Sequence, residues 1–278
     1  MAEYIFTESL CKGRLAFDRI AMLQNYIIDC ADDNVIIKVR SNGRVGLTFV
    51  FMLATLQLIA KKCNKRLKLY LNPKFHMLYR RVRLGSEEDA GAGLHWIRNE
   101  NDIFQLVTKI PSQAPVELDD EVADILVSKI GEMFINAFDH AKATDIVGGN
   151  YFKHQQRFCF TCYDDGIGLT TSVKNFFHSI GQNIPSDIDA LRWAMKNGNT
   201  TKMLDSGIPR GLGLTTLLNF AKANDGAVRI CSGHALYIFN TSGEHYYTLE
   251  NNFIGTLFEM DIIADNSHKY VLQECHYN

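Results

Sequence analysis

The sequence predicts a mixed α/β protein, in which a small α/β domain precedes an α+β domain whose antiparallel sheet carries helices on one face. In the first third of the chain, helix-like and strand-like segments alternate, which is typical of parallel strands joined by helices. In the remainder, one long amphipathic helix precedes a series of strands, which favours an antiparallel sheet. Small and acidic residues without core formers fill residues 85–93. We therefore expect two domains, at residues 1–90 and 91–278.

The N-terminal domain is expected to contain two helices and two strands. Residues 14–29 place apolar side chains at helical spacing, and residues 35–39 are a short β-branched run that predicts a strand. Residues 47–61 form an apolar helix whose closing lysines suit the negative end of a helix dipole. Residues 65–71 alternate polar and apolar side chains, which indicates a second strand. This order is that of a small parallel α/β unit.

The C-terminal domain is expected to begin with a long amphipathic helix over residues 118–143. Strands are expected at residues 146–152 and 157–163, followed by a polar, irregular insert and then by a helix over residues 214–223. Further strands are expected near residues 227–231, 235–240, 245–249 and 256–263. An antiparallel sheet with its helices on one face accounts for this order.

Composition and charge exclude several classes of partner. The 278 residues are 46% hydrophobic and 22% charged, and the formal net charge of -2 provides no attraction to nucleic acid or to an anionic membrane. No apolar run reaches membrane-spanning length, and the first residues lack the basic start and apolar stretch of a signal peptide. We therefore expect a cytoplasmic protein with neither nucleic acid nor membrane among its partners.

The cysteines point to the same compartment. There are seven, an odd number without a disulfide-like framework, which fits a reducing cytoplasm. Cys159 and Cys162 have zinc-like spacing, but the chain has no second such pair. They also lie in an apolar, strand-like run, where residues three apart face opposite sides. We expect buried thiols at both positions.

The long helix carries a row of polar side chains. Glu132, Asn136 and His140 are four residues apart and therefore stack along one face, with Asp139 beside them. An amide oxygen is a suitable ligand for Mg²⁺, which keeps several of its waters, and a carboxylate one turn earlier could act as the general base toward a γ-phosphate. A surface helix with incidental polar residues explains the same row.

A second motif follows the strand expected at residues 157–163. The segment Asp164-Asp165-Gly166-Ile167-Gly168 places a carboxylate at the strand end, and its glycines allow a tight turn. A carboxylate held there could accept a hydrogen bond from an exocyclic amine, which would distinguish adenine from guanine. An ordinary Asp-Gly turn explains the first glycine but gives no reason for the second.

A third motif precedes the helix expected at residues 214–223. Gly207, Gly211 and Gly213 would let backbone N–H groups approach phosphate oxygens at the positive end of that helix. Arg210 could add a charged fork to the terminal phosphate. The glycine spacing differs from that of the dinucleotide-binding motif, and no Gly-Lys-Ser/Thr of a phosphate-binding loop occurs.

The three motifs, in this order, resemble the GHKL ATPases, the superfamily that includes gyrase, MutL, histidine kinases and a heat-shock chaperone. The long helix is similar to that family's N box, the strand-end turn to its first glycine box and the loop to its second. The matching residues are Glu132 and Asn136, then Asp164, Gly166 and Gly168, then Gly211, Leu212, Gly213 and Leu214, and finally Thr256, which follows Gly255 in the family's closing element. The resemblance covers about residues 118–263. It implies an α+β two-layer sandwich of the histidine-kinase-like type, with Mg·ATP bound under a lid formed by residues 169–210.

Within this superfamily, the spacing of Glu132, Asn136 and His140 is most similar to that of the anti-sigma-factor serine kinases. A histidine kinase is disfavoured, because none of the nine His residues lies in a helix of the phosphoacceptor type. Residues 33–79 resemble a STAS domain in their order of strand, turn, helix and strand. Residues 44–47, Arg-Val-Gly-Leu, replace the Asp-Ser-Gly-Leu phosphoacceptor of such domains, so a docking or dimerisation role is favoured there.

The resemblance thus implies an enzyme that binds ATP and Mg²⁺, either an ATPase or a serine/threonine kinase of a regulatory partner protein. Glu132 would be the base, Asn136 the magnesium ligand, and Asp164 and Thr256 the adenine contacts. The other residues expected around the nucleotide are Asp139, His140, Gly166, Gly168, Gly207, Arg210, Gly211, Leu212, Gly213 and Leu214. The alternative is a nucleotide-gated binding module, in which ATP closes the lid and reshapes a partner surface with little turnover. A homodimer is compatible with either.

Overall fold

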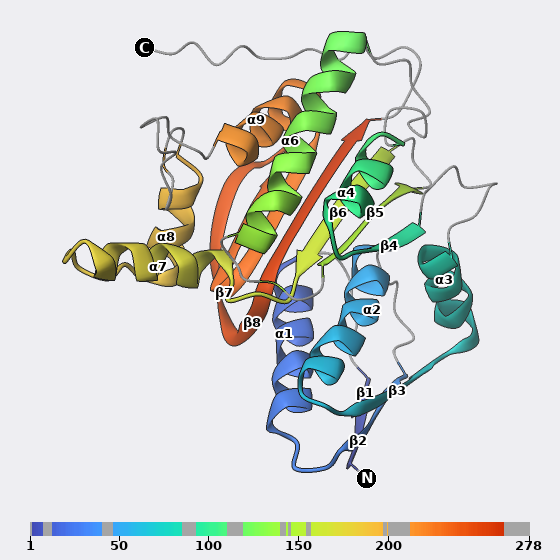
Figure 1. Cartoon of the computed structure of the whole chain (residues 1–278). Coiled ribbons are helices and arrows are strands. Elements are labelled where there is room, and N and C mark those ends of the chain that lie inside the picture. Colours follow the sequence, from blue (N-terminus) through green and yellow to red (C-terminus); the bar gives the residue numbers. More distant parts are fainter. Residues whose placement is uncertain are drawn as a thin grey trace.

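The computed structural model describes residues 2–7, 13–40, 47–84, 93–109, 119–139, 143, 146–153, 157–196, 199 and 212–263. The fold is mixed α/β, with a three-stranded parallel sheet and a five-stranded antiparallel sheet (Figure 1). This confirms the fold class expected from the alternation of helices and strands and from the strand-rich C-terminal part.

The N-terminal unit contains the three-stranded sheet, in the order β1-β2-β3. The strands are connected by α1 and α2, and α3 follows the last strand. Their bounds are β1 Ala2–Phe6, α1 Arg14–Asp29, β2 Asn34–Val39, α2 Leu47–Lys62, β3 Arg66–Leu71 and α3 Pro73–Leu84. The sequence predicted both connecting helices and the second and third strands to within one residue. It missed β1 and α3.

The C-terminal unit contains the five-stranded sheet, in the order β4-β5-β6-β8-β7, with every neighbouring pair antiparallel. Figure 1 shows α4, α6 and α9 on one face of this sheet, and α7 and α8 as a helical pair at its side. The bounds are β4 Gly93–Ile97, α4 Glu100–Val107, α6 Asp120–Asp139, β5 Ile146–Lys153, β6 Arg157–Asp164, α7 Leu169–Ser179, α8 Asp187–Ala194, α9 Leu212–Ala223, β7 Ala227–Asn240 and β8 Gly243–Ile263.

Several expectations for the C-terminal unit are corrected. The unit does not begin with the long helix, because β4 and α4 precede α6. The last part of the chain forms two long strands, β7 and β8, in place of the four short strands expected there. Shifts of register on either side of Gly233 introduce the irregularity that the sequence suggested as a strand break. The insert after residue 163, expected to be irregular, contains α7 and α8.

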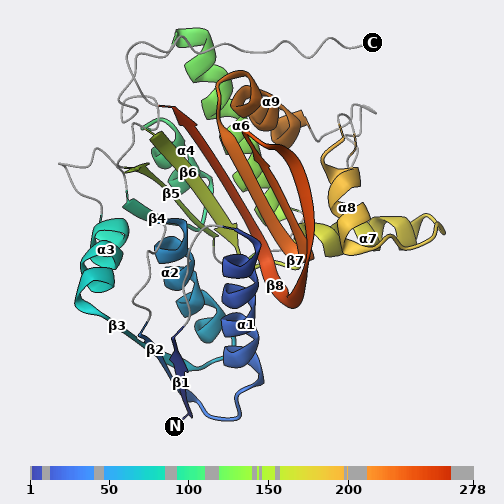
Figure 2. The ribbon, with the colours of Figure 1, turned by 180° about the vertical axis from the view of Figure 1, so that it is seen from behind.

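The helices do not cover only one face of the large sheet. Strand residues alternate between two apolar clusters: Tyr163 and Leu257 belong to one, and Cys162 and Phe258 to the other. The second cluster lies under α4, α6 and α9, whereas the first is shared with α1 and α2 of the N-terminal unit. One end of the opposite face is therefore buried by the N-terminal helices, and Figure 2 shows α1 and α2 over that end from behind.

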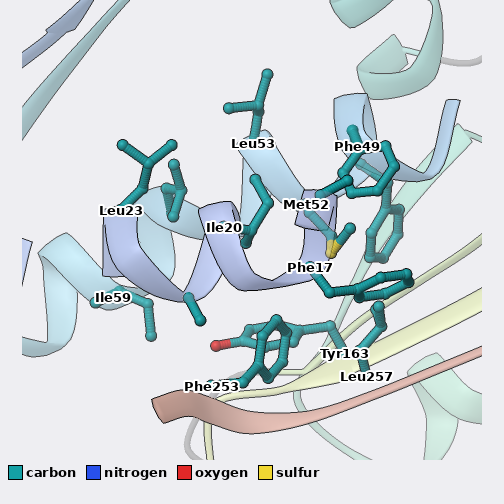
Figure 3. Close-up of a cluster of buried hydrophobic side chains, with 14 of the residues drawn as sticks. Phe17, Ile20, Leu23, Phe49, Met52, Leu53, Ile59, Tyr163, Phe253 and Leu257 are labelled. Carbon is teal, nitrogen blue, oxygen red and sulfur yellow. The ribbon is translucent and has the colours of Figure 1, made fainter. Parts of the chain in front are cut away.

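The contact between the two units is dense. Figure 3 shows Phe17 and Ile20 of α1 and Met52 of α2 above Tyr163 and Phe253 of the large sheet. Burial of such side chains is the largest favourable term in folding, so one continuous core joins the units. The boundary between residues 90 and 91 lies outside the described residues and stays a prediction.

Helix α6 packs closely on the sheet because β5 has a glycine beneath it. A Cβ atom on Gly148 would lie 2.5 Å from Cζ of Phe134, so any larger residue would push the helix away. Phe134 in turn meets Phe160 of β6 edge to face, with ring centroids 6.0 Å apart. These contacts set the height of α6, and hence of Glu132 and Asn136, above the sheet.

None of the helices described is both long and apolar enough to cross a membrane. The buried thiols expected in β6 are confirmed, because Cys159 and Cys162 are both inaccessible to solvent.

Candidate functional site

Three polar side chains form a row across the end of the large sheet. Asp164 of β6 pairs with Thr256 of β8, and Thr256 pairs with Ser232 of β7. Their neighbours Tyr163 and Leu257 face the N-terminal helices, so the polar row faces the side covered by α6. Residues about 90 positions apart in the sequence, Asp164 and Thr256, are thus brought side by side, as the motifs predicted.

Hydrogen bonds define the position of the Asp164 carboxyl. Its Oδ1 accepts from the backbone N–H of Gly166 at 2.9 Å, and its carboxyl also accepts from the Thr256 hydroxyl. The hydroxyl oxygen of Thr256 accepts from the backbone N–H of Leu169 at 2.9 Å. One threonine therefore connects the carboxyl to the first residue of α7, and the turn, β8 and α7 are held as a single unit.

The second glycine of the turn has a structural reason that sequence inspection did not supply. Gly168 has φ 84°, and a Cβ there would lie 2.7 Å from Oγ of Ser232. Opposite it, Gly255 has φ 78°, and a Cβ there would lie 1.9 Å from the carbonyl oxygen of Asp164. The turn and β8 approach each other more closely than any side chain at either position allows.

Burial raises the pKa of Asp164 from 3.8 to about 7. The hydrogen bonds from Gly166 and Thr256 and the charge of Lys62 act in the opposite direction, while the neighbouring Asp165 raises the pKa further. Cys162 and Tyr163, the other titratable neighbours on β6, have pKa values raised by burial and by Asp164, so they stay neutral. Asp164 therefore changes its charge near neutral pH, and its oxygens can accept from a ligand amine once it is ionised.

The α6 residues lie in a different environment. The Glu132 side chain is 42% exposed, and its Oε1 lies 2.7 Å from Nζ of Lys129, one turn earlier. Asn136 is half-buried one turn later. Asp139 ends the helix, its side chain is outside the described set, and so is His140. The ion pair with Lys129 is what an ordinary helix surface would show, so the structure leaves both interpretations of this row open.

The phosphate loop is described only at its helical end. Gly207, Arg210 and Gly211 lie outside the described residues, as do residues 197, 198 and 200–206 of the expected lid. Helix α9 begins at Leu212, two residues earlier than predicted, so Gly213 falls within its first turn. Leu214 packs against the core cluster beneath α6, and α9 contacts α6 directly. The positive end of α9 therefore lies at the loop that the motif assigned to phosphate.

Helices α7 and α8, which belong to the expected lid, are attached to the sheet beside the polar row. Asp187 of α8 accepts from the backbone N–H of His234 at 2.7 Å and forms an ion pair with Lys174 of α7. A Cβ on Gly233 would lie 2.7 Å from the Asp187 carboxylate, so this junction also depends on a glycine. No sequence motif indicated a role for Asp187, because its partners lie on other elements.

Oxygen donors dominate this region. Among the residues that the structure describes, no three His, Cys, Asp or Glu side chains come together as a metal-binding group. The residues fit an Mg²⁺ ion that arrives with a triphosphate, because such an ion needs only one or two protein oxygens and retains water for the rest. Asn136 would be the protein ligand on α6.

Comparison with family models and with curated proteins finds no match for this chain.

Proposed function

We propose that the chain binds Mg·ATP between α6 and the α7–α8 segment, and that it is an ATPase or a serine/threonine kinase acting on a regulatory partner protein. In this proposal residues 118–263 adopt the histidine-kinase-like ATPase fold, and the N-terminal unit is STAS-like. The observation that carries the proposal is the buried Asp164 paired with the half-buried Thr256 on the face of the sheet that α6 covers. A buried carboxyl that titrates near neutral pH is costly, and such groups cluster at functional sites.

The base would be recognised by the ionised Asp164. Its carboxylate would accept from an exocyclic amine, which adenine has and guanine lacks at that position. Thr256 keeps the carboxyl oriented, because its own oxygen is held by the N–H of Leu169. Binding would therefore connect the base to the first turn of α7, at the start of the lid.

The phosphates would lie over the N-terminus of α9, where backbone N–H groups and the helix dipole favour an anion. Asn136 would supply an oxygen to the magnesium ion, which neutralises charge on the phosphates. Glu132 would accept a proton from the attacking water or hydroxyl. To do so it must exchange its contact with Lys129 for one with the nucleophile.

The Lys129 contact favours a second candidate function. While Glu132 is engaged by its own helix, ATP could bind and close the lid without chemistry, and the protein would act as a nucleotide-gated binding module. The two candidates differ in turnover and agree on nucleotide binding.

Replacement of Asp164 by Asn tests the site itself. We expect the affinity for ATP to fall by about 10- to 100-fold, because a hydrogen bond to a charged acceptor is lost and the amide presents a donor to the base. The preference for ATP over GTP should also decline. Isothermal titration calorimetry with both nucleotides and Mg²⁺ measures this, and an unchanged affinity for ATP would contradict the placement of the base.

The same variant has an internal control for folding. The folded-state pKa of Asp164 lies above its unfolded value, so the stability that this carboxyl contributes is fully present below about pH 4 and is lost as pH rises through about 7. Asn cannot ionise. The Asp164→Asn protein should therefore be more stable than the wild type above pH 7, and equal or less stable near pH 4. Loss of binding together with greater stability separates a binding role from a structural one.

The titration of Asp164 also predicts a pH dependence. If the adenine amine donates only to the ionised carboxylate, ATP affinity should increase as pH rises through about 7 and should level off above it. The phosphates of the nucleotide titrate in the same range. The profile of Asp164→Asn reports that contribution alone, so the difference between the two profiles isolates Asp164. Parallel profiles would exclude the carboxylate from the binding step.

A further inference from the structure

The N-terminal unit reaches the turn that carries Asp164. Lys62, the last residue of α2, donates from Nζ to the main-chain carbonyl of Asp165, and the same nitrogen lies 3.8 Å from the Asp165 carboxylate. The Asp165 side chain is 1% exposed, whereas that of Lys62 is 45% exposed. Lys62 therefore lies at the surface and contacts the buried turn at Asp165, a residue 103 positions later in the sequence.

Helix α1 forms hydrogen bonds with β6 and β8, the two strands that carry Asp164 and Thr256. Gln24 is fully buried, and its Oε1 accepts from the backbone N–H of Ile254 at 2.9 Å. Its Nε2 donates to the hydroxyl of Tyr163 at 3.4 Å, and that hydroxyl donates to the carbonyl of Ile254 at 3.0 Å. Tyr163 immediately precedes Asp164, and Ile254 lies two residues before Thr256. One buried amide therefore connects both strands of the Asp164–Thr256 pair.

Ile254 lies at an irregularity in the pairing of β8 with β7. The register of β7 and β8 shifts between Ser232 and Gly233, so that Ser232 pairs with Thr256 and Gly233 with Phe253. Backbone groups at such an irregularity need partners from outside the ladder, and Gln24 and Tyr163 provide them. Asp18 of α1 adds a further contact with β8, since it accepts from the backbone N–H of Asn251 at 2.9 Å.

We infer that Lys62 is a positioning residue of the nucleotide site: it holds the main chain at Asp165, and through it the turn from Asp164 to Gly168, in the form that receives the base. The N-terminal unit is then a working part of the site and not only a docking or dimerisation unit. This inference rests on the proposed binding of ATP. It assigns a role to a residue that none of the three motifs contains.

Lys62 also acts on Asp164 through its charge. Its ammonium lowers the pKa of Asp164, while burial and Asp165 raise it. Loss of the ammonium should therefore move the pH at which ATP affinity rises to a higher value. A residue that served only to join the two units would change stability without moving this midpoint.

The test compares three substitutions in the full-length protein. Lys62→Met keeps the length of the side chain and removes its charge and donors. Lys62→Arg keeps both, and should restore function. Lys68→Met, on the exposed side of β3, removes the same charge from the N-terminal unit and is the matched control.

For Lys62→Met we expect the dissociation constant for Mg·ATP to rise about three- to tenfold at neutral pH. The midpoint of the pH range over which ATP affinity increases should also move to a higher pH. Lys62→Arg should bind nearly as the wild type does, and Lys68→Met should be indistinguishable from it in both measures. Wild-type affinity and an unmoved pH midpoint in Lys62→Met would overturn the inference. So would an equal loss in Lys68→Met.

Amide hydrogen exchange, measured in the absence of nucleotide, distinguishes a failure of this inference from a failure of the proposed function. Peptides covering residues 163–169 should exchange faster in Lys62→Met than in the wild type or in Lys68→Met, because the turn loses its support. If the wild type binds no ATP, the proposed function fails. Faster exchange would then still show that Lys62 holds the turn, and unchanged exchange would reject the positioning role as well.

Discussion

In the Glu132→Gln variant, release of phosphate from Mg·ATP is expected to fall by about 10²- to 10⁴-fold, which is the usual contribution of a general base. ATP affinity should change little, because the amide keeps the size and polarity of the side chain and Asn136 still provides an oxygen to the metal. The measurement is steady-state phosphate release, together with calorimetric binding of ATP under the same conditions. Loss of turnover with binding retained assigns the chemistry to Glu132.

Lys129→Met is the matched control on the same helix. It removes the partner that holds Glu132 at 2.7 Å and leaves the carboxylate in place. Turnover at or above the wild-type level is expected, since the base no longer has to leave an ion pair. If wild type and both variants bind ATP but release no phosphate, the protein is not an ATPase: it is either the gated binding module or a kinase whose phosphoacceptor is missing from the assay. If the Glu132→Gln variant releases phosphate as fast as the wild type, another residue is the general base.

Removal of the Arg229 guanidinium is expected to cause the largest loss of stability, about 3–5 kcal/mol for Arg229→Met. Arg229 of β7 forms an ion pair with Glu259 of β8 and a second with Asp261, where the N–O distance is 3.0 Å. All three side chains are largely buried on the face of the sheet that points away from α6. Burial alone would lower the pKa of Arg229, but the two carboxylates outweigh it and raise the pKa above its usual value.

The variant leaves two buried carboxylates without this counter-charge, and an uncompensated buried charge is expensive. Urea denaturation at pH 8 measures the loss. Combining Arg229→Met with Glu259→Gln and Asp261→Asn should recover much of the stability at pH 8. A deficit of less than about 1 kcal/mol, the value typical of exposed pairs, would show that the cluster is solvated.

The sequence predicted the local elements of the site well. The amphipathic period of α6, the carboxylate at the end of β6 and the start of α9 are local signals, and each lies within a few residues of where it was expected. The resemblance to a known family, and not their spacing, assigned both Asp164 and Thr256 to adenine, and that role stays a prediction. Their pairing across β6 and β8 is a tertiary fact.

Other features had no local signal. The sequence suggested four short strands in the last part of the chain, because Ser232, Gly233 and the polar residues near Asn251 interrupt the apolar pattern. The structure continues both strands through these points, since the irregular backbone finds partners on α1 for β8 and on α8 for β7. An Asp-Gly turn gave no reason for Gly168, whereas its close approach to Ser232 is sufficient reason for a glycine there.

By itself, then, the sequence determined the mixed α/β class, the two connecting helices of the N-terminal unit, and the residue types of the three motifs. These depend on periodicity and turn chemistry, which neighbouring residues set. Only the tertiary structure decided that α1 and α2 bury the back of the large sheet and that Lys62 and Gln24 support the Asp164 turn. Such contacts join residues more than one hundred positions apart, and they follow from the way apolar faces pack, which no short stretch of sequence encodes.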